Sequence, residues 1–488
     1  PGSGCRANDW AVAVFEPHPD PDAVIRQAAD LVEAILAAER AEPVKPTPGA
    51  TDAIRELKLS IPERGVGDDG AIAALRKVML ATPPTAGPVF FNQLFGGREP
   101  VATVAEIAKA VVNSSMYTYK AAGVQVLLEQ QLIAHMLDFA GWSGGDGLFT
   151  PGGSMSNMAG MIIGRNEMLE GAREQGLSVA GAGDRLMLYV SEESHYSVRK
   201  SAGLIGLGRD SVRFVEADAA GRMIPATLNE AIEHDIADGA RPMMIVATSG
   251  TTVMGAFDPI DAIADVAERH GLWLHVDGAF GGTSLLSPDH RHLMAGLDRA
   301  DSFTWDAHKM MGVPLVSSVC LTREPGLTTK HFDESASYLF QQDSDDLNPG
   351  TRSIQCGRPN EAIKLWALWQ ALGDDGYAAR TNRQVELARY VADRVREDDD
   401  FVLSVEPEWA TVCFELKNKP SDAICEALDD QQLAKLGFGI VKGRRVIRLV
   451  TVNPHLTEAD FDRLLGQIKH VGADLPETDN ALTEPAIG

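Results

Sequence analysis

Residues 243–277 decide the fold. They read Met243-Met-Ile-Val-Ala-Thr248, then a helical pattern over 259–270, and then Leu272-Trp-Leu-His-Val276 before Asp277. The first run is apolar almost throughout, as a strand covered on both faces of its sheet must be. A strand, a helix and a second strand in this order are typical of a parallel sheet.

The same alternation extends outward from this unit in both directions. Further strands are predicted over 186–191, 212–217, 302–305 and 317–321, and a further helix over 224–238. The pattern predicts an α/β fold whose central sheet is mostly parallel and covered by helices on both faces.

Helical patterns flank the alternating region. Residues 1–88, 101–142 and 360–397 are predicted to be helical with breaks. A small α+β region follows, with strands at 402–404 and 411–415, a helix over 423–435, a hairpin of 439–442 and 446–450, and a last helix that starts at Thr457 with Asp460 in a capping box. The tail after Gly472 is expected to be frayed.

Three parts are therefore expected. They are an N-terminal helical arm over 1–100 that packs on something else, a large cofactor-binding domain over 101–360, and a small C-terminal α+β domain over 361–488.

The composition of the 488 residues excludes several kinds of partner. Lys and Arg number 44 against 69 Asp and Glu, a net charge of −25, whereas nucleic acids and anionic membranes bind clustered basic side chains. No apolar run is long enough to span a membrane, and the N-terminus lacks the pattern of a signal peptide. The five cysteines form no CxxC pair, so we expect buried thiols, no metal site and a cytoplasmic protein.

A lysine follows one predicted strand, in Ser302-Phe-Thr-Trp-Asp-Ala-His308-Lys309-Met-Met-Gly312. Lysine is seldom buried unless it is paired or reactive, and a desolvated lysine can form a Schiff base with an aldehyde. Taken alone, a surface lysine with its ammonium group in water is the simpler interpretation.

Two further stretches change that interpretation. His275-Val-Asp277-Gly-Ala279 ends a strand, at the edge where open α/β sheets bind ligands. Thr150-Pro-Gly-Gly-Ser154-Met155-Ser156-Asn157 opens a helix and offers N–H groups and hydroxyls to a phosphate, although Ser and Asn are also ordinary helix caps. A phosphate cup, a carboxylate for a pyridinium nitrogen and a lysine for an aldehyde together predict a pyridoxal 5'-phosphate site.

Several runs between about residues 88 and 470 carry a family pattern. They are Phe90-Phe-Asn-Gln93-Leu94, Tyr117-Thr-Tyr119, Gly152-Gly-Ser-Met-Ser-Asn157, Ser194-His195-Tyr196-Ser197, Ala247-Thr-Ser-Gly-Thr-Thr252, Gly255-Ala-Phe-Asp-Pro259, Leu272-Trp-Leu-His-Val-Asp277, His308-Lys-Met-Met-Gly312, Ser337-Tyr-Leu-Phe-Gln-Gln-Asp343 and Gln355-Cys-Gly-Arg358. Together they resemble the group II pyridoxal phosphate-dependent decarboxylases, in the branch of glutamate, cysteine-sulfinate and aspartate decarboxylases.

The resemblance implies pyridoxal phosphate fold type I, the aspartate aminotransferase-like fold, and a role for each matching residue. The implied catalytic residues are Lys309, which holds the cofactor's aldehyde, Asp277, which pairs with its ring nitrogen, and His195, which stacks on its ring. The other implied cofactor contacts are Ser154, Met155 through its N–H, Ser156, Thr252, Ala279 and His308.

Four residues are implied in substrate binding. Arg448 resembles the arginine that holds the α-carboxylate, and Gln93 would help to hold the distal acid group. Ser115 and Tyr117 stand where glutamate-specific members have residues like Asn and Phe. We therefore expect decarboxylation of a short acidic L-amino acid (cysteine sulfinate, aspartate or cysteate) to the amine and carbon dioxide, with glutamate as the second candidate.

Two positions depart from the family pattern. The family carries a tyrosine a few residues after the run ending in Asp343; it reaches the neighbouring subunit's site and protonates the carbanion, and this chain has none there. Its loss leaves open a shift toward transamination or oxidation. Asp306 stands where the family has Asn near the phosphate, and we expect it to accept hydrogen bonds from backbone N–H groups.

Other functions stay open at this point. Another fold type I enzyme, such as an aminotransferase, aldolase or lyase, would share the cofactor residues but lack the decarboxylase runs. The intact Lys309, Asp277 and His195 argue against an inactive homologue that serves as a binding protein. Because the family's site is shared between subunits, the resemblance also implies a homodimer in which each arm packs on the other chain.

Overall fold

The computed structural model describes residues 21–40, 50–180, 185–334 and 347–482. The chain divides into two units, Pro1–Pro84 and Thr85–Gly488. The helices of the first unit are α1 (Pro21–Arg26), α2 (Ala28–Arg40), α3 (Ala50–Leu57) and α4 (Gly67–Ala81). Neither α2 nor α4 has a buried residue. The helical character expected here is confirmed for the described residues.

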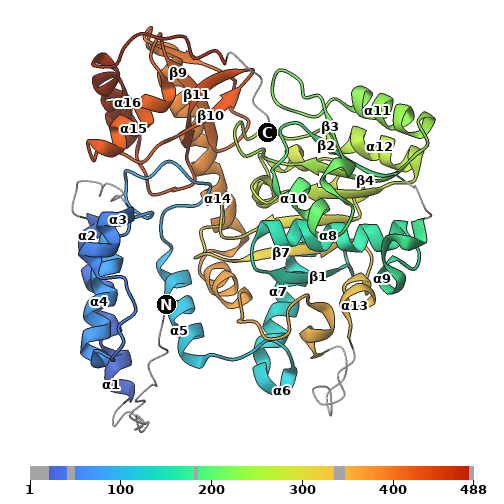
Figure 1. Cartoon of the computed structure of the whole chain (residues 1–488), viewed down its shortest axis with the longest axis horizontal. Helices are drawn as coiled ribbons and strands as arrows, with labels where there is room; N and C mark the ends of the chain where they lie inside the picture. The colour runs from blue at the N-terminus through green and yellow to red at the C-terminus, as the bar shows by residue number, and fades with distance from the viewer. Residues whose placement is uncertain (1–20, 41–49, 181–184, 335–346, 483–488) are drawn as a thin grey trace, which may run out of the picture. The chain divides into compact units, whose positions relative to one another are not determined.

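Seven strands of the second unit form one sheet in the order β1-β7-β6-β5-β4-β2-β3 (Figure 1). They are β1 (Asp146–Thr150), β2 (Arg185–Ser191), β3 (Val212–Val215), β4 (Ala240–Thr248), β5 (Trp273–Asp277), β6 (Ser302–Asp306) and β7 (Ser318–Thr322). The neighbours from β3 to β6 run parallel, and β7 pairs antiparallel with β6 and β1. The predicted mostly parallel sheet is confirmed.

Helices cover both faces of this sheet. The helices of the second unit are α5 (Pro100–Val112), α6 (Tyr119–Ala122), α7 (Val124–Ala140), α8 (Gly153–Met168), α9 (Ala172–Gln175), α10 (Ser197–Leu204), α11 (Pro225–Ala237), α12 (Ile260–His270), α13 (Leu327–Phe332), α14 (Ala362–Glu397), α15 (Ser421–Asp430) and α16 (Glu458–Ala473). One apolar cluster joins α7, α11, α12 and α14 to Ile245, and another joins α8 and α10 to Met244 and Val246. Consecutive residues of β4 thus point into different clusters, which explains its continuous apolar run.

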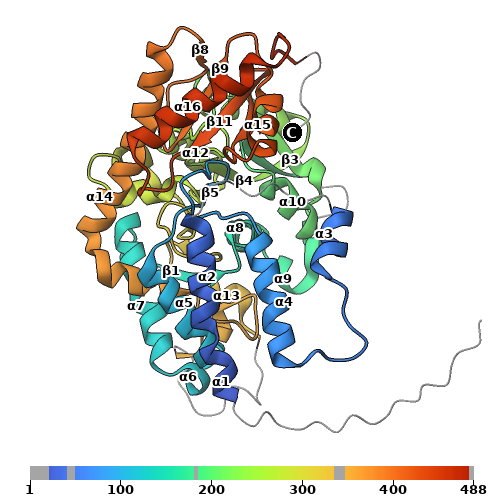
Figure 2. The ribbon, with the colours of Figure 1, turned by 90° about the vertical axis from the view of Figure 1, so that its left-hand side faces the viewer.

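The C-terminal part has its own sheet and its own core. The antiparallel strands β8 (Phe401–Leu403), β9 (Thr411–Leu416), β10 (Gly437–Val441) and β11 (Arg444–Val450) lie in the order β10-β11-β9-β8. A separate apolar cluster joins them to α15 and α16, which lie over this sheet (Figure 2). The predicted capping box of Thr457 and Asp460 is present at the start of α16. The small α+β region is therefore confirmed.

Two local expectations are wrong, and one strand was not predicted. The sequence pattern does not predict β1, because its Asp146 and Gly147 are poor strand formers and only pairing with β7 makes this segment a strand. The helix expected over 423–435 ends at Asp430. The tail is not frayed as far as Leu482, because Ala481 bridges to Arg444 and the buried Asn480 side chain donates to Glu415 and to the Lys419 carbonyl.

None of the helices within the described ranges has the length and apolar character of a transmembrane segment.

Candidate active site

The carboxyl ends of three neighbouring parallel strands meet in one cavity. Thr248, Asp277 and Asp306 are the last residues of β4, β5 and β6, and all three line a cavity of about 200 Å³. The other lining residues are Gly153, Ser154, Asn157, His195, Gly250, Thr252, Ala279, Phe280, His308 and Lys309. This is the edge at which open α/β sheets bind ligands, and the fold brings most of the predicted cofactor residues to it.

Lys309 reaches this cavity from the turn that follows β6. Its side chain is 20% exposed, and its Nζ lies 3.3 Å from Asp306 Oδ2. The next residue holds the turn in place, because the Met310 carbonyl accepts hydrogen bonds from Arg380 Nε at 3.0 Å and from Gln384 Nε2 at 3.1 Å. The lysine is thus largely removed from water but paired, which contradicts the simpler interpretation of a surface lysine.

Asp277 is buried and held by two donors. Its Oδ2 accepts from Asn157 Nδ2 at 2.7 Å and its Oδ1 from the Ala279 N–H at 3.1 Å. Asn157 Oδ1 in turn lies 3.1 Å from His275 Nε2. Burial lowers the pKa of His275 to about 4, so its ring is neutral at pH 7. These bonds fix the orientation of the carboxylate that we expect to meet a ring nitrogen.

His195 lies on the loop after β2, where it lines the cavity. Burial lowers its pKa, and the nearby charge of Asp277 partly opposes that effect. The Ser197 N–H donates to His195 Nδ1 at 3.3 Å, so the proton of the neutral ring lies on Nε2. A neutral, oriented imidazole of this kind suits stacking on an aromatic ring. Ala279 also lines the cavity, as the sequence predicts.

The amino end of α8 contributes less to the cavity than expected. Ser154 lines it, whereas Met155 and Ser156 do not. The Met155 N–H already donates to the Gly152 carbonyl at 2.9 Å. The Ser156 hydroxyl is fully buried between Thr150 Oγ1 at 2.6 Å and Ser318 Oγ at 2.9 Å. Contacts of Met155 and Ser156 with a phosphate therefore stay predictions.

The expectation for Asp306 is wrong. Its carboxylate accepts a hydrogen bond from the Ser318 hydroxyl and pairs with Lys309, rather than meeting backbone N–H groups. The reason is its place at the very end of β6, opposite Ser318 of β7 and one turn before the lysine.

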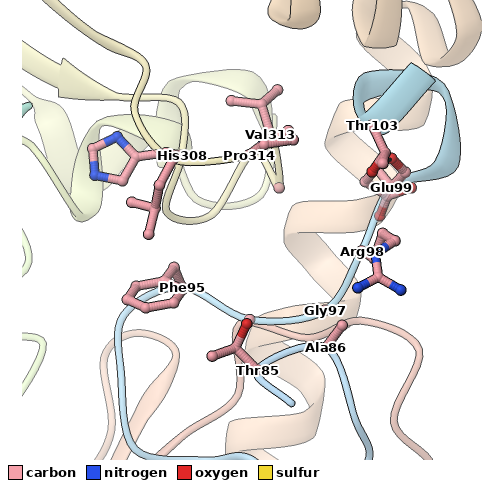
Figure 3. A pocket seen from close by; sticks show the side chains of 13 residues that line it. Thr85, Ala86, Phe95, Gly97, Arg98, Glu99, Thr103, His308, Val313 and Pro314 are labelled. Atoms are coloured by element: carbon pink, nitrogen blue, oxygen red, sulfur yellow. Dashed lines mark hydrogen bonds between the residues drawn. The ribbon is translucent and has the colours of Figure 1, made fainter. Parts of the chain in front are cut away.

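His308 stands between two cavities. It lines the one described above and a second cavity of about 210 Å³, which residues between Thr85 and Thr103 also line (Figure 3). Its Nδ1 lies 2.8 Å from the Ser317 carbonyl, and burial lowers its pKa. Phe95, Gly97 and Glu99 belong to this segment, so the chain that carries Gln93 passes beside His308.

The four predicted substrate residues do not line the cavity of Lys309. Arg448 lies on β11 between Gly437 of β10 and Cys413 of β9, and Cys413 Sγ contacts the Val253 carbonyl next to Thr252. Gln93 is exposed. Ser115 and Tyr117 lie beside the segment 348–358, where the Gly350 N–H donates to the Tyr117 carbonyl at 2.9 Å.

The chemistry of the cavity fits pyridoxal 5'-phosphate. It offers an amine for the aldehyde, a carboxylate for the ring nitrogen, an imidazole for the ring face, and a helix end with Ser154 for the phosphate. The space also depends on a glycine, because a Cβ on Gly153 would lie 2.4 Å from Asp306 Oδ2. Within the described ranges, no group of three or more His, Cys, Asp or Glu residues is placed to hold a metal ion.

Comparison with known proteins agrees with this chemistry. Residues 54–417 match the pyridoxal-dependent decarboxylase conserved domain. The chain belongs to this decarboxylase family. The decarboxylase is 40% identical over 441 residues to the cysteine sulfinic acid decarboxylase of Rattus norvegicus, which covers 86% of this chain and 89% of that protein. It is 38% identical over 441 residues to the acidic amino acid decarboxylase GADL1 of Homo sapiens, with 86% and 84% covered.

A solved structure confirms the fold type of the decarboxylase. Mouse CSAD in its apo form superposes with a TM-score of 0.88 at 36% identity, over 93% of this chain and 99% of that one. The chain is therefore a fold type I, pyridoxal phosphate-dependent carboxy-lyase, as the sequence predicts. Asn157 is one of the cavity residues that stand in the quoted sequence runs without a predicted role. Its place one helical turn inside α8, facing the strand that ends in Asp277, was the available signal.

Proposed function

We propose that this decarboxylase converts a short acidic L-amino acid, such as cysteine sulfinate, aspartate or cysteate, to the amine and carbon dioxide. The observation that supports the binding of an amino acid carboxylate is the environment of Arg448. Its guanidinium is largely desolvated, which lowers its pKa, and its Nε is buried without a hydrogen-bond partner. No carboxylate of the described residues lies within ion-pairing distance of it. A half-buried arginine whose Nε lacks a partner can bind a carboxylate that arrives with a ligand.

The relatives support the acidic substrate. One is named a cysteine sulfinic acid decarboxylase and another an acidic amino acid decarboxylase. In the proposal, Arg448 binds the α-carboxylate of the substrate and Gln93 binds its distal acid group. Ser115 and Tyr117 leave room for a short substrate side chain only.

The proposed roles of the cofactor residues follow from their contacts. The cofactor, when bound, withdraws the electron pair that the departing carboxylate leaves on the α-carbon. Lys309 would hold the aldehyde, and Asp277, kept in place by Asn157, would keep the ring nitrogen protonated. His195 would orient the ring from one face and Ala279 would pack on the other. Ser154, Thr252 and His308 would complete the binding site.

Because the family's loop tyrosine is missing from the sequence, the product of the decarboxylation has to be identified by experiment. The loop that would carry the family's tyrosine, including Gln341 and Asp343, lies outside the described residues. We infer that the amine is nevertheless the main product, because His195 presents an Nε2 proton in the cavity. Supplying cysteine sulfinate to the holoenzyme and quantifying carbon dioxide, amine, aldehyde and pyridoxamine phosphate tests this. One amine per carbon dioxide supports it, and aldehyde or pyridoxamine phosphate in similar amounts contradicts it.

We also propose a homodimer with a shared active site and an arm over 1–100 that packs on the partner chain. Ser115 and Tyr117 stay outside the cavity of Lys309 in a single chain, so a second copy can supply them. The apolar residues Val104 and Val111 on α5 are more than half exposed, as a contact surface requires. A large domain over 101–360, a small one over 361–488 and a cytoplasmic location belong to the same proposal; the free thiols of Cys320, Cys356, Cys413 and Cys425 support the location.

A further inference from the structure

The Asp306 carboxylate lies at the end of the cavity where we expect the anionic phosphate of the cofactor to bind. Asp306 is 1% exposed and lines the cavity together with Gly153 and Ser154, the first two residues of α8. A Cβ built on Gly153 would lie 2.4 Å from Asp306 Oδ2 and 2.9 Å from Oδ1. The carboxylate is therefore in direct contact with the first turn of this helix.

The charges around Asp306 come from few groups. Lys309 Nζ lies 3.3 Å from its Oδ2, and His308 Nε2 lies 3.7 Å away. Because burial lowers the pKa of His308, that ring is mostly neutral at pH 7. The Ser318 hydroxyl donates a hydrogen bond but carries no charge. Lys309 is thus the main counter-ion of Asp306 among the described residues.

This arrangement opposes the binding of a phosphate ester. The N-terminus of a helix attracts one anion, and Asp306 already supplies a negative charge at the α8 end. A phosphate at the same end would bring a second negative group beside a carboxylate that is almost fully buried, and like charges repel more strongly there than in water. Lys309 cannot compensate fully, because its amine is also the group that the cofactor's aldehyde requires.

We propose that Asp306 limits the affinity of this protein for its cofactor by acting as a fixed anion beside the phosphate. The protein consequently exchanges its cofactor more readily than it would with a neutral residue at this position. The occupied fraction then depends on the supply of the cofactor. The inference concerns the phosphate group alone and holds whichever amino acid is the substrate.

The substitution Asp306→Asn tests the proposal, because it removes the charge and keeps both the size and an acceptor for Ser318. Dissociation constants of the cofactor-free protein are measured by equilibrium dialysis for pyridoxal 5'-phosphate, inorganic phosphate and pyridoxal. We expect the variant to bind the first two about tenfold or more tightly, and pyridoxal within about threefold of the unchanged protein. Unchanged or weaker binding of the two phosphates overturns the proposal. Equal tightening for pyridoxal also overturns it, because the effect would then act through Lys309.

Two further variants separate the local charge from other causes. Asp301→Asn makes the same charge change directly before the other end of β6, where the side chain meets the Leu274 N–H and Arg323 instead of the cavity. We expect it to leave phosphate binding within about twofold, since the charge is remote. Tightening by both variants would mean that net charge decides the affinity, against the proposal. If Asp306→Asn folds poorly, Asp306→Ser carries the same expectation and is judged by the same constants.

Discussion

Asn157 holds the Asp277 carboxylate, which we expect to pair with the cofactor's ring nitrogen, against the rest of the protein. Its amide donates to Asp277 at 2.7 Å and to Ser197 Oγ at 3.2 Å, while its carbonyl oxygen faces the neutral ring of His275. A hydrogen bond to a charged group contributes about 1.5–3 kcal/mol. Removing it leaves one oxygen of a buried carboxylate without its donor, which favours the protonated form of Asp277.

We therefore predict that Asn157→Leu lowers kcat about 10- to 100-fold while KM changes little. The visible absorbance of the bound cofactor should change as well, because the charge beside its ring nitrogen changes. Asn166→Leu is the matched control, since Asn166 is a buried asparagine on the same helix that contacts Arg165 and His331 instead. Equal losses in the two variants would refute a specific role for Asn157.

Glu193 makes stability depend on pH. Burial, and then the charge of Glu192, raise its pKa from 4.5 to about 7. Between these values the unfolded chain releases the proton and the folded chain keeps it, so the free energy of unfolding falls as pH rises through this window and stays lower above it.

For Glu193→Gln we expect the Tm to match that of the unchanged protein near pH 4.5 and to exceed it at pH 8. Thermal unfolding monitored by circular dichroism at both pH values measures the difference. Glu216→Gln, at an exposed position, should show no such dependence on pH. A gain for Glu193→Gln that is the same at both pH values would show that the pKa of this carboxyl is not raised.

The sequence predicted which residues form the site more accurately than it predicted which residues contact one another. Lys309, Asp277, His195, Ala279 and Thr252 meet in one cavity because each follows a strand or belongs to a motif whose chemistry is recognisable. Partners such as Asn157 for Asp277, or Ser318 and Lys309 for Asp306, come from strands and helices distant in sequence. No local pattern encodes such pairs.

At the scale of elements, α14 connects the turn that contains Lys309 to the strand β11 that contains Arg448. The buried Gln384 donates to the Met310 carbonyl at 3.1 Å, beside Lys309, and to the Val452 carbonyl at 2.5 Å, just beyond β11. Thr451 Oγ1 donates to the Gln384 carbonyl at 2.8 Å. One helix thus fixes the lysine turn against the strand that carries Arg448.

The substitution Gln384→Met keeps the length of this side chain and removes its donors. It should lower the free energy of unfolding by about 1–3 kcal/mol, because the Val452 carbonyl loses this donor while the Met310 carbonyl keeps Arg380 Nε. It should also raise KM for the substrate, because Arg448 and Lys309 are no longer held together. Chemical denaturation and steady-state kinetics measure the two effects. Gln431→Met, at an exposed position after α15, should change neither. Normal stability and KM in Gln384→Met would contradict the proposed coupling.

Strands and helices could be predicted from the sequence where apolar residues form a continuous run or recur at a regular spacing. The continuous apolar runs of β2, β4 and β5, which are covered on both faces of the sheet, predict these strands directly. The strand β1 was missed because its pairing with β7 decides its conformation. The ordered tail was missed for a similar reason, since Asn480 is held by Glu415 and not by its neighbours in sequence.

At the scale of the whole molecule, the proposed shared site leads to a prediction about mixed dimers. Tyr117→Ala and Lys309→Ala should each reduce activity strongly when purified alone. If Tyr117 serves the partner's cavity, a dimer of one chain of each kind has one intact site, and random pairing restores about a quarter of full activity. Activity assays after co-expression measure this. Mixtures as inactive as the single variants would place Tyr117 and Lys309 in the same chain's site.

Decarboxylation of a short acidic amino acid by this protein is tested by measuring kcat/KM for cysteine sulfinate, aspartate, cysteate and glutamate. Carbon dioxide and amine are measured with the same holoenzyme preparation under the same conditions. Because one methylene changes discrimination by about 10- to 200-fold, we predict that at least one short substrate exceeds glutamate about tenfold or more. An equal or larger kcat/KM for glutamate, or no carbon dioxide from any of the four, would contradict a preference for short acidic amino acids.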